Sequence, residues 1–147
     1  MADAVPALSH AATAECAVAA PAAFALLCDG AQIGRWALGA WATEPRGDGL
    51  YVGRSLFDGS ETWIRPVPDR ARLLIDYHVG SGPATLVPRI MARVMPGPQV
   101  GRGGGVCLVT LLAWRDGGMS AERRQRLVAC HAPASLLLQA MRGGSAP

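Results

Sequence analysis

The chain has 147 residues, the usual size of one domain, and its composition of 50% hydrophobic and 17% charged residues excludes a disordered chain. Its formal net charge of +3 is too small to indicate a nucleic-acid partner. All fourteen basic residues are arginines, which excludes a Schiff-base lysine and the lysine of a phosphate-binding loop.

The first elements along the chain are short. Residues 1–12 are rich in alanine and without pattern, and we expect a loose tail there. Residues 13–19 are a candidate strand, although alanine is a weak strand former. Pro21 suits the first turn of a helix, so we predict a short helix over residues 22–28 and a second over residues 31–36.

The hydrophobic pattern then changes to a period of two, which is typical of strands. Turn residues such as Asp58-Gly59 separate the candidate segments and favour hairpins. Residues 80–105 are unusually rich in glycine and proline and form either a lid or a long hairpin around one strand. The predicted strands are residues 39–44, 50–57, 61–67, 72–79, 89–95 and 106–115.

A long helix is predicted at the end of the domain. Ser120 can cap it, and Gly143-Gly144 ends it after Arg142. A run of strands followed by one helix argues for an α+β protein with an antiparallel sheet, one face of which the helix covers. We therefore expect a single domain over residues 13–142, with a C-terminal tail at 143–147.

This order of elements resembles the helix-grip superfamily, also called SRPBCC, which includes START domains, bacterial aromatase/cyclases and the major birch-pollen allergen. The local marks are Pro21 in Ala-Ala-Pro-Ala-Ala-Phe, Trp36 after the short helix pair, the hairpin strands and the closing helix. The resemblance implies a curved antiparallel sheet of six or seven strands around the long C-terminal helix, with two short helices after the first strand and a pocket between sheet and helix.

Two functions follow from that resemblance. Members of the superfamily bind lipids, sterols, hormones or polyketides, so one expectation is binding of a hydrophobic or aromatic small molecule in an internal cavity. Other members catalyse cyclisation, dehydration or related lyase chemistry. The alternative is therefore a cofactor-free cyclase, dehydratase or lyase that uses acid–base catalysis on an aromatic or polyketide-like substrate.

Three residues are candidate proton carriers for that alternative: Asp76, His78 and His131. Asp76 and His78 share one face of a predicted strand, because side chains alternate along a strand. One interpretation places the pair on the outer face in solvent, and the other places it in the cavity, where the carboxylate orients the imidazole. His131 lies in the apolar stripe of the closing helix, either as a hydrogen-bonded core residue or as a proton carrier.

Six residues are candidate ligand contacts. Strand parity favours Tyr51 and Phe57 as inward-facing, and likewise Thr110 and Trp114, because Arg115 marks the other side of its strand as the wetter one. Trp63 and Trp114 are chosen among the four tryptophans as pocket walls. Arg93 is either a solvent-facing arginine or an anchor for a ligand carboxylate or enolate.

The remaining expectations concern cofactors, partners and location. No metal or nucleotide motif is present, and three histidines make a metal centre improbable, so no cofactor is expected. An exposed strand edge would let two chains pair as a homodimer. No segment reaches the ~18 apolar residues of a membrane span, and no signal-peptide pattern is present. Four scattered cysteines (Cys16, Cys28, Cys107 and Cys130) indicate reduced thiols and a cytoplasmic protein.

Overall fold

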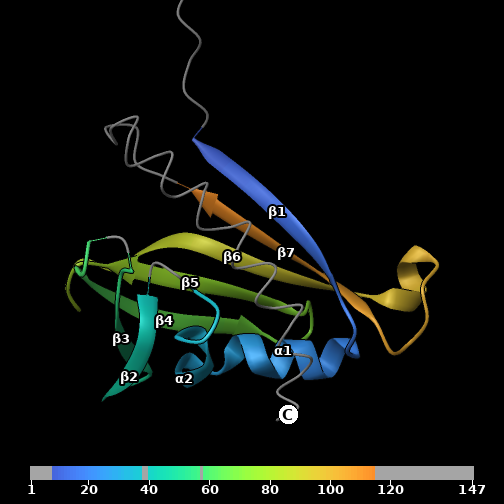
Figure 1. Cartoon of the computed structure of the whole chain (residues 1–147), viewed down its shortest axis with the longest axis horizontal. Helices are drawn as coiled ribbons and strands as arrows, with labels where there is room; N and C mark the ends of the chain where they lie inside the picture. Colours follow the sequence, from blue (N-terminus) through green and yellow to red (C-terminus); the bar gives the residue numbers. More distant parts are fainter. Residues whose placement is uncertain (1–7, 38–39, 57, 115–147) are drawn as a thin grey trace, which may run out of the picture.

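The computed structural model describes residues 8–37, 40–56 and 58–114. Its seven strands form one antiparallel sheet in the order β1-β7-β6-β5-β4-β3-β2, and the sheet bends around α1 and α2 (Figure 1). The elements are β1 (Ser9–Cys16), α1 (Ala20–Cys28), α2 (Gly30–Ile33), β2 (Trp41–Gly47), β3 (Leu50–Arg54), β4 (Glu61–Asp69), β5 (Leu74–Gly80), β6 (Val87–Pro96), the 3-10 helix η2 (Gly97–Val100) and β7 (Cys107–Trp114). The predicted α+β class with a curved antiparallel sheet is confirmed. The predicted closing helix over residues 120–142 lies outside the described residues.

The first strand is longer than its sequence predicts. β1 begins at Ser9, so residues 9–12, which were assigned to the N-terminal tail, belong to the sheet. Every residue of β1 has a partner on β7, and the hydroxyl groups of Thr13 and Thr110 hydrogen-bond across the pair at 2.8 Å. Tertiary pairing therefore overrides the weak strand preference of the alanines.

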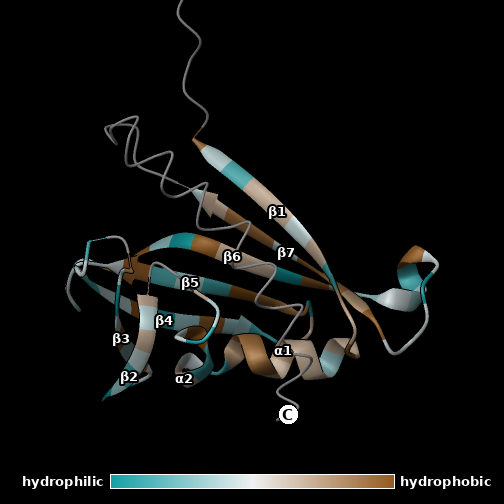
Figure 2. Cartoon of the chain, in the orientation of Figure 1, coloured by the Kyte–Doolittle hydropathy of each residue, from teal (hydrophilic) through white to brown (hydrophobic). Residues whose placement is uncertain are grey.

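The two faces of the sheet differ in burial. We call the face toward α1 the inner face and the opposite one the outer face. Hydrophilic residues interrupt the hydrophobic ones along β5 and β6, whereas β7 is hydrophobic over most of its length (Figure 2). The buried inner-face residues are Ala14, Cys16, Ile64, Ile75, Tyr77, Ala92, Val94, Cys107, Val109, Leu111 and Ala113. Together with Phe24 and Leu27 of α1 they form the core.

The predicted parity of the last strand is wrong. Cys107, Val109, Leu111 and Ala113 are buried on the inner face, whereas Thr110 is half-buried and Trp114 is 37% exposed on the outer face. Both sets of this strand contain large apolar residues, so the strand itself does not distinguish its faces. The pairing with β1 and β6 places each residue, because directly paired residues share a face.

The segment rich in glycine and proline divides into two connections around β6. A turn joins β5 to β6, and η2 with a glycine-rich stretch joins β6 to β7. Gly101 ends η2 with a φ of 75°, a left-handed conformation that glycine adopts without a steric penalty. The segment is therefore hairpin-like. In the described part of the chain, no helix is long and apolar enough to span a membrane.

Candidate functional site

A buried tyrosine joins the sheet to α1. Tyr77 projects from the centre of β5, and its hydroxyl donates a hydrogen bond of 2.6 Å to the main-chain oxygen of Leu27 at the end of α1. Burial raises the pKa of Tyr77 well above that of a free phenol. The phenol therefore stays neutral and its proton is committed to α1.

The hydroxyl group of Thr43 bonds to both ends of helix α2. Thr43 of β2 donates to the carbonyl of Gly30 at 2.7 Å and accepts from the main-chain N–H of Gly34 at 3.0 Å. The two glycines allow this close approach, because a Cβ on Gly30 would overlap the ring of Tyr51 and one on Gly34 would overlap the backbone of β2. A helix of one turn has little stability of its own, so these contacts fix the segment that follows it.

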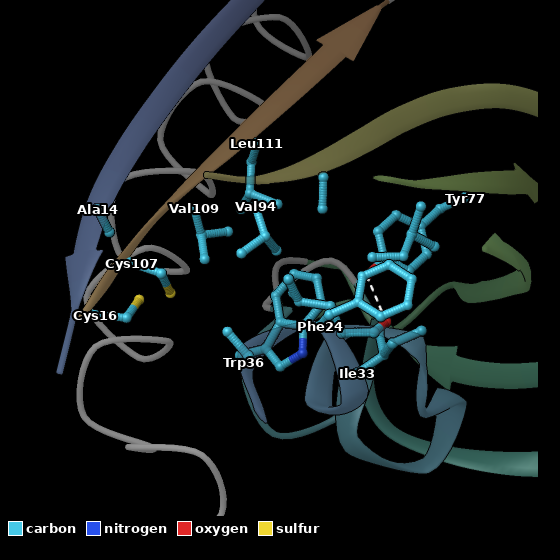
Figure 3. Packing of buried hydrophobic residues seen from close by; sticks show 14 of the residues in the cluster. Ala14, Cys16, Phe24, Ile33, Trp36, Tyr77, Val94, Cys107, Val109 and Leu111 are labelled. Carbon is cyan, nitrogen blue, oxygen red and sulfur yellow. Dashed lines mark hydrogen bonds between the residues drawn. The ribbon is translucent and has the colours of Figure 1, made fainter. Parts of the chain in front are cut away.

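Trp36 follows that segment and points into the core. Its ring meets Tyr77 edge to face, with centroids 6.0 Å apart, beside Phe24 and Ile33 (Figure 3). The side chain is only 4% exposed, and its indole Nε1–H has no hydrogen-bond acceptor among residues 8–37, 40–56 and 58–114. A buried donor without an acceptor costs about 1–3 kcal/mol. It therefore marks a place where an acceptor atom would gain a strong interaction.

The inner face around this donor is apolar. Over the described strands β1, β3–β5 and β7, and over β6 from Ile90 on, the inner-face positions carry no carboxylate and no guanidinium. The polar side chains there include the phenol of Tyr77, the thiols of Cys16 and Cys107, and His10 opposite Ala113. Such a surface can bind an apolar body and offer it one hydrogen-bond donor.

Asp76 and His78 lie on the outer face. Asp76 pairs with Val67 and Met91, His78 pairs with Arg65 and Pro88, and both side chains are half-buried. Of the two interpretations of this pair, the outer-face one is the arrangement in the structure. His131, the third proposed proton carrier, lies outside the described residues.

The predicted ligand contacts do not gather at one place. Trp63 is half-buried on the outer face, where its Nε1 donates to a carboxylate oxygen of Glu61 at 3.3 Å. Arg93 is exposed on the same face, between the buried residues Ala92 and Val94. Its register neighbours there are Thr110 and Leu74.

Tyr51 is the described residue of that set that faces inward. It pairs with the buried Ile64, and its ring packs on Gly30 of α2. Phe57, predicted on the same side, lies outside the described residues. The space beside Gly53, two residues after Tyr51 along β3, is occupied by the main chain of Ala40.

Sequence reasoning assigned no functional role to Trp36 or Tyr77. The face of Tyr77 depended on which of the two interpretations of Asp76 and His78 held, and Trp36 was one tryptophan of four. The position of Trp36 at the end of the predicted helix pair could have singled it out. A tryptophan at that position packs into the core and does not belong to either face of a strand. Its missing acceptor is a tertiary property that local sequence does not reveal.

Several solved structures share this fold. A protein named XoxI from Bacillus cereus superposes with a TM-score of 0.71 at 13% identity, covering 92% of this chain and 96% of that one. A START superfamily protein from Mycobacterium smegmatis gives 0.66 at 11% identity, with 92% and 97% covered. The ZhuI aromatase/cyclase from a Streptomyces species gives 0.61 at 16% identity, with 92% and 91% covered.

No protein-family model and no curated protein matches the sequence. The identities to the solved structures are low, so they establish the fold. The resemblance read from the order of elements is confirmed at the level of the fold: the chain folds like the START superfamily protein and the aromatase/cyclase.

Proposed function

We propose that the protein binds a small hydrophobic or aromatic molecule against the inner face of the sheet, and that the Trp36 indole N–H donates a hydrogen bond to an oxygen of that ligand. The observation that carries the proposal is the buried, unpaired Nε1 of Trp36. An acceptor on a ligand would remove the cost of that unpaired donor, and the apolar residues around it would receive the rest of the molecule.

Binding demands less of this surface than catalysis does. An apolar wall and one oriented donor are sufficient for recognition, and Phe24, Tyr77 and Trp36 supply them. Acid–base catalysis needs a proton carrier beside the ligand. Asp76 and His78 face away from α1, which favours binding over the cyclase, dehydratase or lyase alternative.

The test uses two aromatic probes that differ in one acceptor. Acetylnaphthalene carries a carbonyl oxygen, and isopropylnaphthalene, substituted at the same ring position, has a similar shape without it. We expect the ketone to bind the purified protein roughly five- to tenfold more tightly, the range of one good hydrogen bond. Fluorescence titration of the tryptophans measures both dissociation constants.

The Trp36→Phe variant keeps an aromatic ring and removes the N–H. In this variant the preference for the ketone should vanish, whatever happens to the affinity for the hydrocarbon. Trp63→Phe is the matched control, because that indole already donates to Glu61 on the outer face. A ketone preference that survives Trp36→Phe, or equal binding of both probes to the unaltered chain, contradicts the proposal.

A further inference from the structure

Two cysteines far apart in the sequence face each other across the edge of the sheet. Cys16 of β1 and Cys107 of β7 are direct partners in the antiparallel register. They are 3% and 0% exposed, and their sulfur atoms lie together in Figure 3, close enough for one thiol to hydrogen-bond the other. Directly opposed residues of antiparallel strands have Cα atoms about 4.5–5.5 Å apart, within the separation that a disulfide spans.

We propose that Cys16 and Cys107 form a reversible cross-strand disulfide that fastens the edge strand β1 to β7 when the protein meets a peroxide. In the described structure both cysteines are free thiols. The pair is distinct from the ligand contacts proposed above, so the two proposals stand or fall separately.

The chemistry needs hydrogen peroxide as its only co-reactant. The first thiol releases its proton and the thiolate attacks a peroxide oxygen. The O–O bond breaks, a sulfenic acid forms, and the departing hydroxide takes up the released proton as one water. The second thiol, deprotonated as it reacts, attacks the sulfenic sulfur, the S–O bond breaks, and the hydroxide leaves as a second water with that proton. The two thiols are thus oxidised by two electrons in total, and the peroxide is reduced to two waters.

The surroundings of the two cysteines should make the first step of this reaction slow and the second step fast. Burial raises the pKa of the Cys16 thiol to about 11 and also raises the pKa of Cys107, so both are protonated in the closed protein. Among the described strands, β1 is at the edge of the sheet and pairs only with β7, so we expect peroxide to reach the thiols when the end of β1 opens. Once a sulfenic acid forms, the adjacent thiol is already in place to trap it.

The disulfide would constrain most of the described domain as well as the edge strand β1. The chain between Cys16 and Cys107 contains α1, α2 and the strands β2–β6, so the disulfide would close most of the described domain into one ring. A cross-link over so long a loop removes much of the freedom of the unfolded chain. The oxidised protein should therefore resist unfolding better than the reduced one.

The decisive experiment uses the Cys28→Ser/Cys130→Ser variant, which keeps only the proposed pair. After treatment with hydrogen peroxide in native buffer and blocking of free thiols, trypsin releases residues 1–35 and 103–115, each with one cysteine. We expect these peptides as one disulfide-linked species that dithiothreitol separates. Free thiols, or sulfinic acid on unlinked peptides, would overturn the proposal.

Thermal unfolding tests the fastening itself. Peroxide should raise the midpoint of the same variant by on the order of 10 °C, and dithiothreitol should reverse the rise. Adding Cys107→Ala gives the matched control, in which peroxide should leave the midpoint unchanged. If the linked peptide forms but the unfolding midpoint does not rise, the disulfide does not fasten β1 and that part of the proposal is wrong. If the variant with Cys107→Ala does not fold, the peptide measurement still tests the disulfide, because it does not use that substitution.

Discussion

The two faces of β5 differ in polarity and burial. On the inner face, Tyr77 is fully enclosed and tied to Leu27, and Ile75 lies beside it in the core. On the outer face, Asp76 and His78 are half-buried between neighbouring strands. In a sequence, Asp76 and His78 suggest catalysis more readily than Tyr77 does. In the structure, however, it is Tyr77 that lies on the inner face, toward the helices. For this reason the proposed ligand contacts of this chain are neutral groups.

The strongest test of this contrast uses two adjacent leucines of β7. Leu111 is 1% exposed on the inner face, whereas Leu112 is half-buried on the outer face opposite Met91. Leu111→Ala should lower the free energy of unfolding by about 3 kcal/mol, because it removes buried apolar contacts and leaves a cavity. Leu112→Ala should cost about 1 kcal/mol or less. Urea denaturation measures both, and equal losses would break the distinction between the faces.

A smaller effect is expected at the phenol that links β5 to α1. Tyr77→Phe keeps the ring and leaves the Leu27 carbonyl without its donor. We expect a loss of about 1–2 kcal/mol in the free energy of unfolding, the cost of an unpaired buried carbonyl. Tyr51→Phe is a matched control, because Tyr51 is only half-buried and contacts Gly30 through its ring. If Tyr77→Phe leaves the free energy of unfolding unchanged, the hydrogen bond between Tyr77 and Leu27 does not stabilise the protein.

The smallest effects should come from the outer-face pair. His78→Ala and Asp76→Asn remove groups that lie away from the core, so each should change the free energy of unfolding by no more than about 0.5 kcal/mol. Neither should alter the ketone preference of the naphthalene probes. A large loss of probe affinity in His78→Ala, measured by the same fluorescence titration, would return the outer face to consideration as a functional surface.

Much of the fold follows from local signals in the chain. Pro21 lies in the first turn of α1, and Asp58-Gly59 separates β3 from β4, both as predicted. These signals act over a few residues, through a fixed φ or a favoured turn. β1 was predicted to begin four residues too late and to end three residues too late, because its alanines carry no such signal and only the pairing with β7 defines its bounds.

The candidate site was less predictable because it depends on register. Trp114 was expected inside because Arg115 follows it, but the alternation of β7 places large apolar residues on both faces. Trp63 and Trp36 are equally hydrophobic, and only the folded core separates the one that pairs with Glu61 from the one without an acceptor. Cys16 and Cys107 likewise have no common motif, and they meet only when β1 pairs with β7.

The hydroxyl group of Thr43 has a consequence for how selectivity could change over time. It bonds to both ends of α2, and Trp36 lies three residues beyond that helix, so the orientation of the indole depends in part on a side chain of β2. Substitutions in β2 could therefore retune which molecules are accepted while every contacting residue stays the same. Adaptation to a new ligand would then leave its trace at a distance from the ligand itself.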